Sequence, residues 1–557
     1  MRFCARGPAG GNGMDRRMSE TPWWRGAIIY QIYPRSFLDT DGDGVGDLPG
    51  IVERLDYVAE LGVDAIWVAP FFKSPMADFG YDIADYREVD PLFGTLEDFD
   101  RLLHKAHRLG LKVMIDQVLS HTSAEHPWFR ESRQSRENPR SDWYVWADAR
   151  PDGTPPNNWL SLFGGSAWQW EPRRGQYYLH NFLASQPDLN FHNPDVRAAT
   201  LDNVRFWLDR GVDGVRLDAI NFCFHDRELH DNPPKPSERR VGRGFSPANP
   251  YAFQYHYYNN TQPENLGFLA ELRALMDGYA DVAALGEISS ENSLATMAEY
   301  TVPGRLHMGY SFELLTEDFS AAYIRGTVLQ LEAQMTEGWP CWAISNHDVE
   351  RVLSRWGNGD ASTQLANLFT AMVCSLRGSV CVYQGEELGL TEADVPYESL
   401  RDPYGIAFWP QFKGRDGCRT PMPWSGEDAQ AGFSHGMPWL PVPEEHRARA
   451  VAQQQDDPRS VLNGFRTFMR WRRAHPALRW GDIEFLDTPE PVLAFLRRLE
   501  GDTVLVVFNL GASAVEVTLQ ALPGRPTAID GHGLQAATAQ GGNLQLPGHG
   551  AWFARLD

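Results

Sequence analysis

Short apolar runs alternate along the chain with longer stretches in which apolar residues recur at helical spacing. Segments such as 51–61 and 193–210 carry apolar residues three and four apart, and Thr95 with Asp98 forms a helix-capping pattern. The apolar runs fall at residues 28–33, 65–68, 113–116, 214–218, 282–286, near Tyr310, 342–345 and 380–383. Eight strands separated by helices predict a closed (β/α)8 barrel of parallel strands rather than an open sheet.

Irregular stretches interrupt this alternation. Residues 122–189 are rich in Trp, Pro, Asn and Gly and have no helical period, and such a long insertion usually carries function. Further irregular stretches lie at about 225–260 and 389–443, and from about 481 alternating strands predict a small antiparallel β domain. We therefore expect a disordered tail at 1–20, a barrel at 21–121 and 190–480, an inserted loop-rich domain at 122–189, and a C-terminal β domain at 481–557.

Composition limits the kinds of molecule that we expect the protein to bind. Lys and Arg number 51 against 73 Asp and Glu, a net charge of −22, whereas nucleic acids and anionic membranes are bound by basic surfaces. No apolar run approaches the roughly 20 residues that span a bilayer. Six scattered cysteines form no C-x-x-C pair, as in a cytoplasmic protein with reduced thiols. We expect a cytoplasmic protein with an uncharged small-molecule substrate and with neither a nucleic acid nor a membrane as partner.

Acidic residues follow four of the predicted strands. They are Asp116, Asp218, Glu287 and Asp348, after the third, fourth, fifth and seventh strands. Side chains at the carboxyl ends of barrel strands converge on one site, so four such ends indicate a catalytic centre.

This set suits the cleavage of a glycosidic bond. One carboxylic acid protonates the leaving oxygen, and a carboxylate about 5–5.5 Å away attacks the anomeric carbon in a retaining mechanism. Arg216 lies two positions before Asp218, so both side chains face the same side of their strand. We expect its guanidinium to favour the ionised form of Asp218.

The motifs that contain these residues resemble a known family. Residues 214–218 (GVRLD), 286–287 (GE) and 346–348 (NHD) are similar to the conserved regions of the α-amylase superfamily, glycoside hydrolase family 13. Residues 186–190 (QPDLN) resemble a signature of its oligo-1,6-glucosidase and α-glucosidase branch. The likeness runs from about Trp23 to the C-terminus. It departs at Ser120, where many members have Asn before the histidine.

The resemblance implies a role for each matching residue. Asp218 matches the nucleophile, Glu287 the general acid/base, and Asp348 a third carboxylate that binds sugar hydroxyls. The residues that match substrate-binding positions of the family, or lie beside the nucleophile, are Asp78, Tyr81, His121, Phe163, Phe182, Arg216, His347 and Arg415. Ala219 stands where a Val accompanies α-1,6 preference in this branch, so the resemblance implies a preference for the α-1,4 bond of maltose.

The loop at residues 39–47 has the spacing of a calcium-binding loop. Oxygen ligands at alternate positions, with a glycine at the sixth, follow the EF-hand pattern, although the bidentate Glu at position twelve is missing. The expected ligands are Asp39, Asp41, Asp43, Val45 and Asp47. Similar loops in this branch hold a structural ion, so we expect Ca²⁺ or Mg²⁺.

The sequence as a whole favours an exo-acting, retaining α-glucosidase that also transfers glucose to a sugar, alcohol or phenolic acceptor. Aromatic residues of the insertions, namely Trp159, Phe163, Trp168, Trp170, Phe182 and those between Tyr251 and Tyr258, either wall the acceptor site or only pack together. A sucrose- or maltose-rearranging isomerase is the alternative within the family. A non-catalytic transporter-associated homologue is a remote one, because such proteins usually lack the catalytic carboxylates. We expect a monomer or a homodimer.

Overall fold

The structure is a computed structural model that describes residues 21–240, 248–519, 522–540 and 543–557. The tail predicted at 1–20 lies outside the described residues. At the centre of the molecule, eight parallel strands run in the order β11-β10-β9-β5-β2-β1-β13-β12. A bridge from Gly309 to Pro340 brings β11 to β12 and closes the sheet, so the predicted (β/α)8 barrel is confirmed. The strands are β1 (Ile28–Ile32), β2 (Ala65–Val68), β5 (Lys112–Val118), β9 (Gly214–Asp218), β10 (Ala283–Ile288), β11 (Met308–Ser311), β12 (Cys341–Ala343) and β13 (Ser379–Tyr383).

Each barrel strand is followed by a helix that packs outside it. These helices are α2 (Leu48–Glu60), α3 (Leu96–Arg108), α5 (Pro194–Arg210), α6 (Asn265–Met276), α7 (Ser293–Tyr300), α8 (Ala321–Gln334), α10 (Thr363–Ser375) and α14 (Val461–Arg473). Side-chain caps fix where several begin: Asp47 caps α2, Thr95 and Asp98 form the predicted capping box of α3, and Asn193 caps α5. The cap at Asp47 explains why α2 starts earlier than the apolar pattern at 51–61 suggests.

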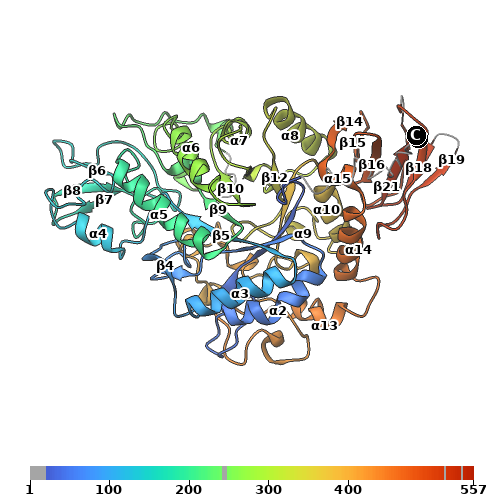
Figure 1. The fold of residues 1–557 in the computed structure, drawn as a ribbon, viewed down its shortest axis with the longest axis horizontal. Coiled ribbons are helices and arrows are strands. Elements are labelled where there is room, and N and C mark those ends of the chain that lie inside the picture. The colour runs from blue at the N-terminus through green and yellow to red at the C-terminus, as the bar shows by residue number, and fades with distance from the viewer. Residues whose placement is uncertain (1–20, 241–247, 520–521, 541–542) are drawn as a thin grey trace, which may run out of the picture.

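Additional elements lie at the two ends of the long axis of the molecule (Figure 1). On one side, the insertion after β5 forms a small sheet in the order β6-β8-β7, with the short helix α4. Two more strands, β3 and β4, come between β2 and α3 in the chain and pair with each other. The bounds of these elements are Trp146–Ala147 (β6), Gln176–Leu179 (β8), Trp168–Glu171 (β7), Pro127–Ser132 (α4), Phe72–Lys73 (β3) and Asp85–Val89 (β4).

On the other side, the predicted C-terminal antiparallel β domain is confirmed. One sheet has the order β14-β15-β16-β21-β18 and a second has the order β17-β20-β19. Their bounds are Asp482–Phe485 (β14), Val492–Leu499 (β15), Asp502–Asn509 (β16), Ala551–Leu556 (β21), Pro526–Ala528 (β18), Val515–Thr518 (β17), Asn543–Leu546 (β20) and Thr538–Gln540 (β19). Arg497 on β15 is fully buried and donates to the carbonyls of Ser375, Leu376 and Leu478, which fixes this domain to the barrel helices. The division of the chain at residues 121, 189 and 480 stays a prediction.

The shorter helices lie mostly in the connections after β12 and β13. They are α9 (Val352–Arg355), α11 (Pro403–Phe408), α12 (Glu444–Ala448), α13 (Val451–Gln454) and α15 (Pro476–Trp480). None of the described helices combines the length and the apolar character that crossing a bilayer requires.

Candidate active site

A cavity of ≈ 100 Å³ lies at the carboxyl ends of the barrel strands, where the sequence predicted a site. Nine of the predicted residues line it: Asp78, Tyr81, His121, Phe163, Phe182, Asp218, Glu287, Asp348 and Arg415. The other two predicted side chains, Arg216 and His347, are buried directly behind this lining and contact it. The structure therefore brings together all the residues that were predicted to act on the sugar.

Arg216 is the centre of one side of this cavity. Its guanidinium is fully buried and lies 2.6 Å from Asp218 Oδ1 and 2.6 Å from Glu287 Oε1. It also donates to Asp116 Oδ1 at 2.9 Å, since Asp116 is its neighbour across β5 and β9. The hydroxyl of Tyr310 accepts from Arg216 and donates to Glu287. One guanidinium thus serves three carboxyl groups.

Burial raises the pKa of each of these carboxyl groups more than Arg216 lowers it. The pKa of Asp218 is raised to about 7, with the charge of Asp116 adding to the effect of burial. The pKa of Glu287 is raised to about 7 and that of Asp116 to about 6, for the same reason. The sequence suggested that Arg216 would keep Asp218 ionised, but burial and the neighbouring carboxyl groups outweigh it. This side of the cavity can hold a proton near neutral pH.

Asp348, on the opposite side of the cavity, has a lowered pKa where the other three carboxyl groups have a raised one. Its Oδ1 accepts from Arg415 at 3.0 Å and from Arg419 at 2.9 Å. Burial opposes its ionisation, but the charges of His347, Arg415 and Arg419 outweigh burial and hold the pKa of Asp348 well below its usual range. Burial lowers the pKa of His347 to about 3, so the lasting positive charge beside Asp348 comes from the two guanidinium groups. Asp348 therefore stays ionised.

An ion pair forms part of the lining of the cavity. Arg415 Nη2 lies 2.9 Å from Asp78 Oδ1 and 2.8 Å from Asp402 Oδ1, and Asp402 also accepts the backbone N–H of Arg415. Gln186 donates to the other oxygen of Asp78 at 3.1 Å. A ligand that enters this cavity therefore meets charged and amide groups in this part of the lining.

Two rings, those of Tyr81 and His121, line the same cavity. Tyr81 stacks on His347 with 5.2 Å between ring centroids and an angle of 6°, and its hydroxyl lies 2.6 Å from His347 Nε2. His121 places its Nε2 3.1 Å from the carbonyl oxygen of Tyr81, and burial lowers its pKa to about 4. Its Nδ1 lies 3.0 Å from Ser120 Oγ, so the Ser that departs from the family pattern still provides this histidine with a partner.

Comparison with known families identifies this arrangement. A family model described as "Alpha amylase, catalytic domain" matches residues 31–481, and one described as "Maltogenic Amylase, C-terminal domain" matches residues 483–552. The chain belongs to the α-amylase family. It is an α-glucosidase or α-glucosyl transfer enzyme of glycoside hydrolase family 13.

Three known proteins are similar to this α-amylase family member over nearly its whole length. A probable α-glucosidase of Rhizobium meliloti (strain 1021) is 55% identical over 538 residues, which cover 96% of this chain and 97% of the relative. The crystal structure of the α-glucosyl transfer enzyme XgtA is 68% identical with a TM-score of 0.95, covering 96% of this chain and 100% of that one. An isomaltulose synthase from Erwinia rhapontici NX5 is 32% identical with a TM-score of 0.85, covering 96% and 99%.

The outer part of the cavity of this α-amylase family enzyme is apolar, and sequence reasoning identified only part of it. Phe163 and Phe182 were predicted, and they pack against Tyr404 and Phe222 respectively. Ala219, which the sequence placed beside the nucleophile, also lines the cavity, and the residues that were missed are Leu162, Gln186, Phe222, Ser289, Phe312 and Tyr404. Signals for two of them were present: Gln186 belongs to the QPDLN motif, and Phe312 directly follows β11. Tyr404, on α11 in the insertion after β13, has no such signal.

Three tryptophans named as possible wall residues do not line the cavity. Trp159 and Trp168 are buried inside the inserted region and stack on each other at 5.7 Å. Trp170 is 41% exposed on the small sheet and pairs with Tyr177. For Trp159 and Trp168 packing is the observed role, because apolar side chains of an insertion must also form its own core.

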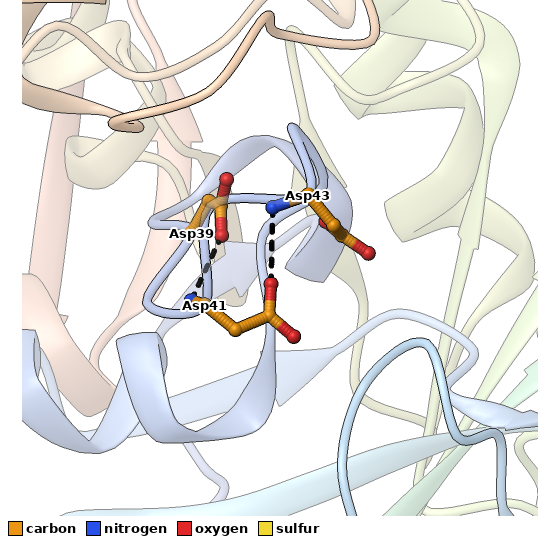
Figure 2. Close-up of side chains that lie close together, drawn as sticks. All are labelled: Asp39, Asp41 and Asp43. Atoms are coloured by element: carbon orange, nitrogen blue, oxygen red, sulfur yellow. Dashed lines mark hydrogen bonds between the residues drawn. The ribbon is translucent and has the colours of Figure 1, made fainter.

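The loop after β1 gathers three carboxylates (Figure 2). Asp39, Asp41 and Asp43 place oxygen atoms within 4.8 Å of one another. Asp39 is buried and accepts the backbone N–H groups of Gly42 at 2.7 Å and Gly44 at 2.8 Å. Burial and the charges of Asp41 and Asp39 raise the pKa of Asp43, a condition that a bound cation relieves. Hard oxygen donors at this spacing fit Ca²⁺ or Mg²⁺.

Asp47, another predicted ligand, lies outside this carboxylate group. Its Oδ1 accepts the N–H of Gly50 at 2.6 Å, and its Oδ2 accepts from both the backbone and the hydroxyl of Thr40. Its carboxylate therefore caps α2 and closes the loop. The backbone N–H of Val45 donates to Asp43 Oδ1 at 2.7 Å.

Proposed function

We propose that the protein is a retaining, exo-acting α-glucosidase that releases or transfers the terminal non-reducing glucosyl unit of short α-glucosides. The observation that carries this proposal is the position of Arg216, whose two arms bind Asp218 and Glu287 at 2.6 Å each. Two carboxyl groups held by one planar guanidinium are close enough for a double displacement through a covalent intermediate.

The first step forms a glucosyl ester. A carboxylate oxygen of Asp218 attacks C1 of the sugar, the bond from C1 to the leaving oxygen breaks, and Glu287 gives its proton to that oxygen. The raised pKa of Glu287 supports its role as the acid, because the group must carry a proton near neutral pH. The pKa of Asp218 is raised to about 7 as well, so the pair can hold one proton near neutral pH; in this proposal Glu287 carries that proton, and Asp218, bound to Arg216, is the ionised partner.

The second step reverses the proton transfer. Glu287, now ionised, takes the proton from water or from an acceptor hydroxyl, whose oxygen attacks C1 as the ester bond to Asp218 breaks. Two inversions retain the α configuration. Asp348, which stays ionised, binds sugar hydroxyls and favours distortion of the ring.

Exo action is supported by the ion pair of Asp78 and Arg415 in the cavity lining, with Gln186 beside it. In this proposal the pair binds the terminal glucose and blocks a further sugar unit. Charge-assisted hydrogen bonds from these groups recognise the hydroxyls of that glucose. Tyr81 and His121 bind the ring from the side.

Transfer to acceptors is supported by the apolar outer cavity. Water is present at about 55 M, so an acceptor competes only where the site binds it and excludes water. Phe163, Phe222, Phe312 and Tyr404 offer flat apolar surfaces to a sugar face, an alcohol or a phenol. Ala219 leaves room for the leaving group of an α-1,4 bond, and we propose maltose as the preferred short donor.

The loop after β1 is proposed to hold a structural Ca²⁺ or Mg²⁺ through Asp39, Asp41, Asp43 and the carbonyl of Val45. When bound, the ion neutralises the carboxylates and fixes a loop that also reaches the insertion after β13, because Asp39 accepts from the hydroxyl of Ser434. It lies apart from the cavity residues and supplies no group to the reaction.

Azide rescue tests the roles of the two carboxyl groups. With 4-nitrophenyl α-glucoside as donor, Asp218→Ala should give β-glucosyl azide, because azide attacks C1 directly from the vacated face. Glu287→Ala should still form the ester on Asp218, and azide should then give α-glucosyl azide. Unchanged turnover in either variant, or the opposite anomers, would contradict the assignment. Circular dichroism melts of both variants show whether the fold is intact.

Product analysis separates the proposed function from the isomerase alternative. Sucrose incubated alone should give glucose, fructose and transfer products if the enzyme hydrolyses and transfers. Accumulation of a rearranged disaccharide as the main product would instead assign the chain to the isomerases of the family.

A further inference from the structure

A second cavity of ≈ 320 Å³ lies beside the first, and the two share Ser289 and Phe312. Its walls come from the irregular segment after β9 and from the loop after β10. Ser289 stands two residues after Glu287, the proposed acid/base. A molecule whose hydroxyl reaches Glu287 therefore has this second cavity available for the rest of its body.

Among the described residues that line the second cavity, positive charges outnumber negative ones. Lys235 Nζ forms an ion pair with Glu291 Oε2 at 2.8 Å, and the other oxygen of Glu291 accepts the backbone N–H of His256 at 3.0 Å. Both oxygens of Glu291 are thus satisfied within the protein. The ammonium of Lys235 has three N–H groups, and this ion pair uses one of them.

Arg239 adds a second cation to the same lining, and its side chain is exposed to solvent. Two cations and one paired acid leave a local excess of positive charge, although the whole chain has a net charge of −22. An anion in the second cavity is therefore attracted by groups in its walls while the rest of the molecule repels it.

Aromatic rings lie next to these cations. Lys235 Nζ stands 5.4 Å from the centroid of Tyr255, which stacks on Tyr257 at 5.0 Å and 7°. Phe312 lies at the junction of the two cavities. The space between Glu287 and the cations Lys235 and Arg239 is thus bordered by flat apolar surfaces that suit an aromatic ring.

We propose that the second cavity binds acceptors that carry a carboxylate, and that Arg239 and Lys235 make phenolic carboxylates better glucose acceptors than the matching neutral amides. The inference rests on the proposed transfer function. In the transfer step the phenol oxygen forms its bond to C1, the ester bond to Asp218 breaks, and the phenolic proton passes to Glu287. The carboxylate takes no part in bond making and serves only to bind the acceptor.

Acceptor competition tests the proposal. With maltose as donor near neutral pH, initial rates of glucoside formation are measured for 4-hydroxybenzoate, 3-(4-hydroxyphenyl)propanoate and the amide of each. We expect kcat/KM for the acceptor to be about 5-fold higher for at least one carboxylate than for its amide, and the ratio to fall with added salt. A ratio of 1 for both pairs would overturn the proposal.

Variants of Arg239 show whether the cavity causes the preference. Arg239→Gln should lower the ratio towards about 1–2, and Arg239→Glu should lower it further, while the rates with the amides stay unchanged. Arg459→Gln, which removes the same charge from a side chain 90% exposed and outside both linings, should leave the ratio as it is. If Arg239→Gln and Arg459→Gln behave alike, the proposal is wrong.

Absence of transfer to both acceptor types in the wild type would overturn the proposed transfer function as well, whereas equal transfer overturns only this inference.

Discussion

The two sides of the catalytic cavity use the same kinds of side chain to opposite effect. On one side, Arg216 is shared among Asp116, Asp218 and Glu287, and the pKa values of these carboxyl groups rise to about 6 or 7. On the other side, one oxygen of Asp348 accepts from two guanidinium groups, those of Arg415 and Arg419, although Arg415 also pairs with Asp78 and Asp402, and the pKa of Asp348 is held well below the usual range.

This difference teaches that the number of guanidinium groups in contact with a carboxyl group, rather than burial alone, decides which acid carries a proton. Every one of these carboxyl groups is deep in the protein, so burial raises the pKa throughout. Where one cation serves three acids, burial prevails and a proton is retained for Glu287 to deliver. Where two guanidinium groups contact the same carboxylate, ionisation prevails, and Asp348 remains a fixed negative charge.

Replacing the central arginine of each side should have the largest effect and should separate chemistry from binding. Arg216→Lys places a single point charge where a planar fork reached three carboxyl groups, so we expect kcat to fall about 100-fold or more. Arg415→Lys weakens the ion pairs with Asp78 and Asp402 while Arg419 still pairs with Asp348, so we expect mainly a KM about 10-fold higher. Steady-state kinetics on maltose measure both. If Arg216→Lys changes only KM, the two sides do not differ as described.

The raised pKa of Glu287 also predicts how stability depends on pH. The folded-state pKa of about 7 lies above the ordinary value of 4.5, so the folded protein binds this proton more tightly than the unfolded chain does. The stabilisation by that proton is complete below about pH 4.5 and is lost as the pH rises through about 7. Glu287→Gln stays neutral, so its free energy of unfolding should exceed that of the wild type by about 1–3 kcal/mol at pH 8.

Urea unfolding at several pH values measures this difference. The excess stability of Glu287→Gln should shrink towards zero as the pH falls to about 4.5. Asp348→Asn provides the matched control on the other side, and because the pKa of Asp348 is lowered, that variant should be destabilised at neutral pH. Equal pH dependence of the two variants would remove the physical basis of the comparison.

Metal removal should change stability without altering either side of the cavity. An ion bound only by the folded loop stabilises the protein by about 2.7 kcal/mol at a free concentration 100 times its dissociation constant. Chelation should therefore lower the urea midpoint, while kcat and its pH profile under folding conditions stay within about 2-fold. In the double variant Asp41→Asn/Asp43→Asn, the chelator should have no such effect. An unchanged midpoint in the wild type, together with no metal by elemental analysis, would contradict the proposed site.

Much of the active site could be predicted from the sequence because the barrel topology determines which strand ends meet. Parallel strands bring their carboxyl ends together, so Asp218 and Glu287 had to meet once the strands were recognised. The sharing of Arg216 with Glu287 was not foreseen, since it depends on the register between β9 and β10. Arg419, four residues after Arg415, acts on Asp348 through a turn that no periodic pattern describes.

The insertions were the least predictable part. Their backbone follows no regular period, so the direction of each side chain depends on tertiary contacts that the sequence does not display. Phe163 and Trp159 lie four residues apart in one aromatic-rich segment, yet Phe163 lines the cavity and Trp159 is buried in the core of the insertion. Composition indicated an aromatic wall but not which rings would form it.

The smallest predicted effect concerns Ala219. This residue contacts the side of the cavity that is formed by Arg216 and its three carboxyl groups, here called the proton-holding side. Its N–H donates to Glu287 Oε2 at 3.1 Å, and its backbone is left-handed, with φ of 40°. Val at this position adds two methyl groups beside the leaving-group site and branches at Cβ where the backbone already disfavours it. We expect kcat/KM for maltose to fall more than that for isomaltose, so that the ratio of isomaltose to maltose rises about 5-fold.

Ala219→Gly is the control for the backbone, because it relieves the left-handed conformation without narrowing the site. It should keep the preference for maltose, which separates the steric effect of Val from a displaced N–H at Glu287. If Ala219→Gly shifts the ratio as much as Ala219→Val does, the linkage preference depends on the contact with Glu287 rather than on space for the leaving group. In that case the proton-holding side would govern specificity as well as chemistry, and the division of labour between the two sides would be weaker than the charges suggest.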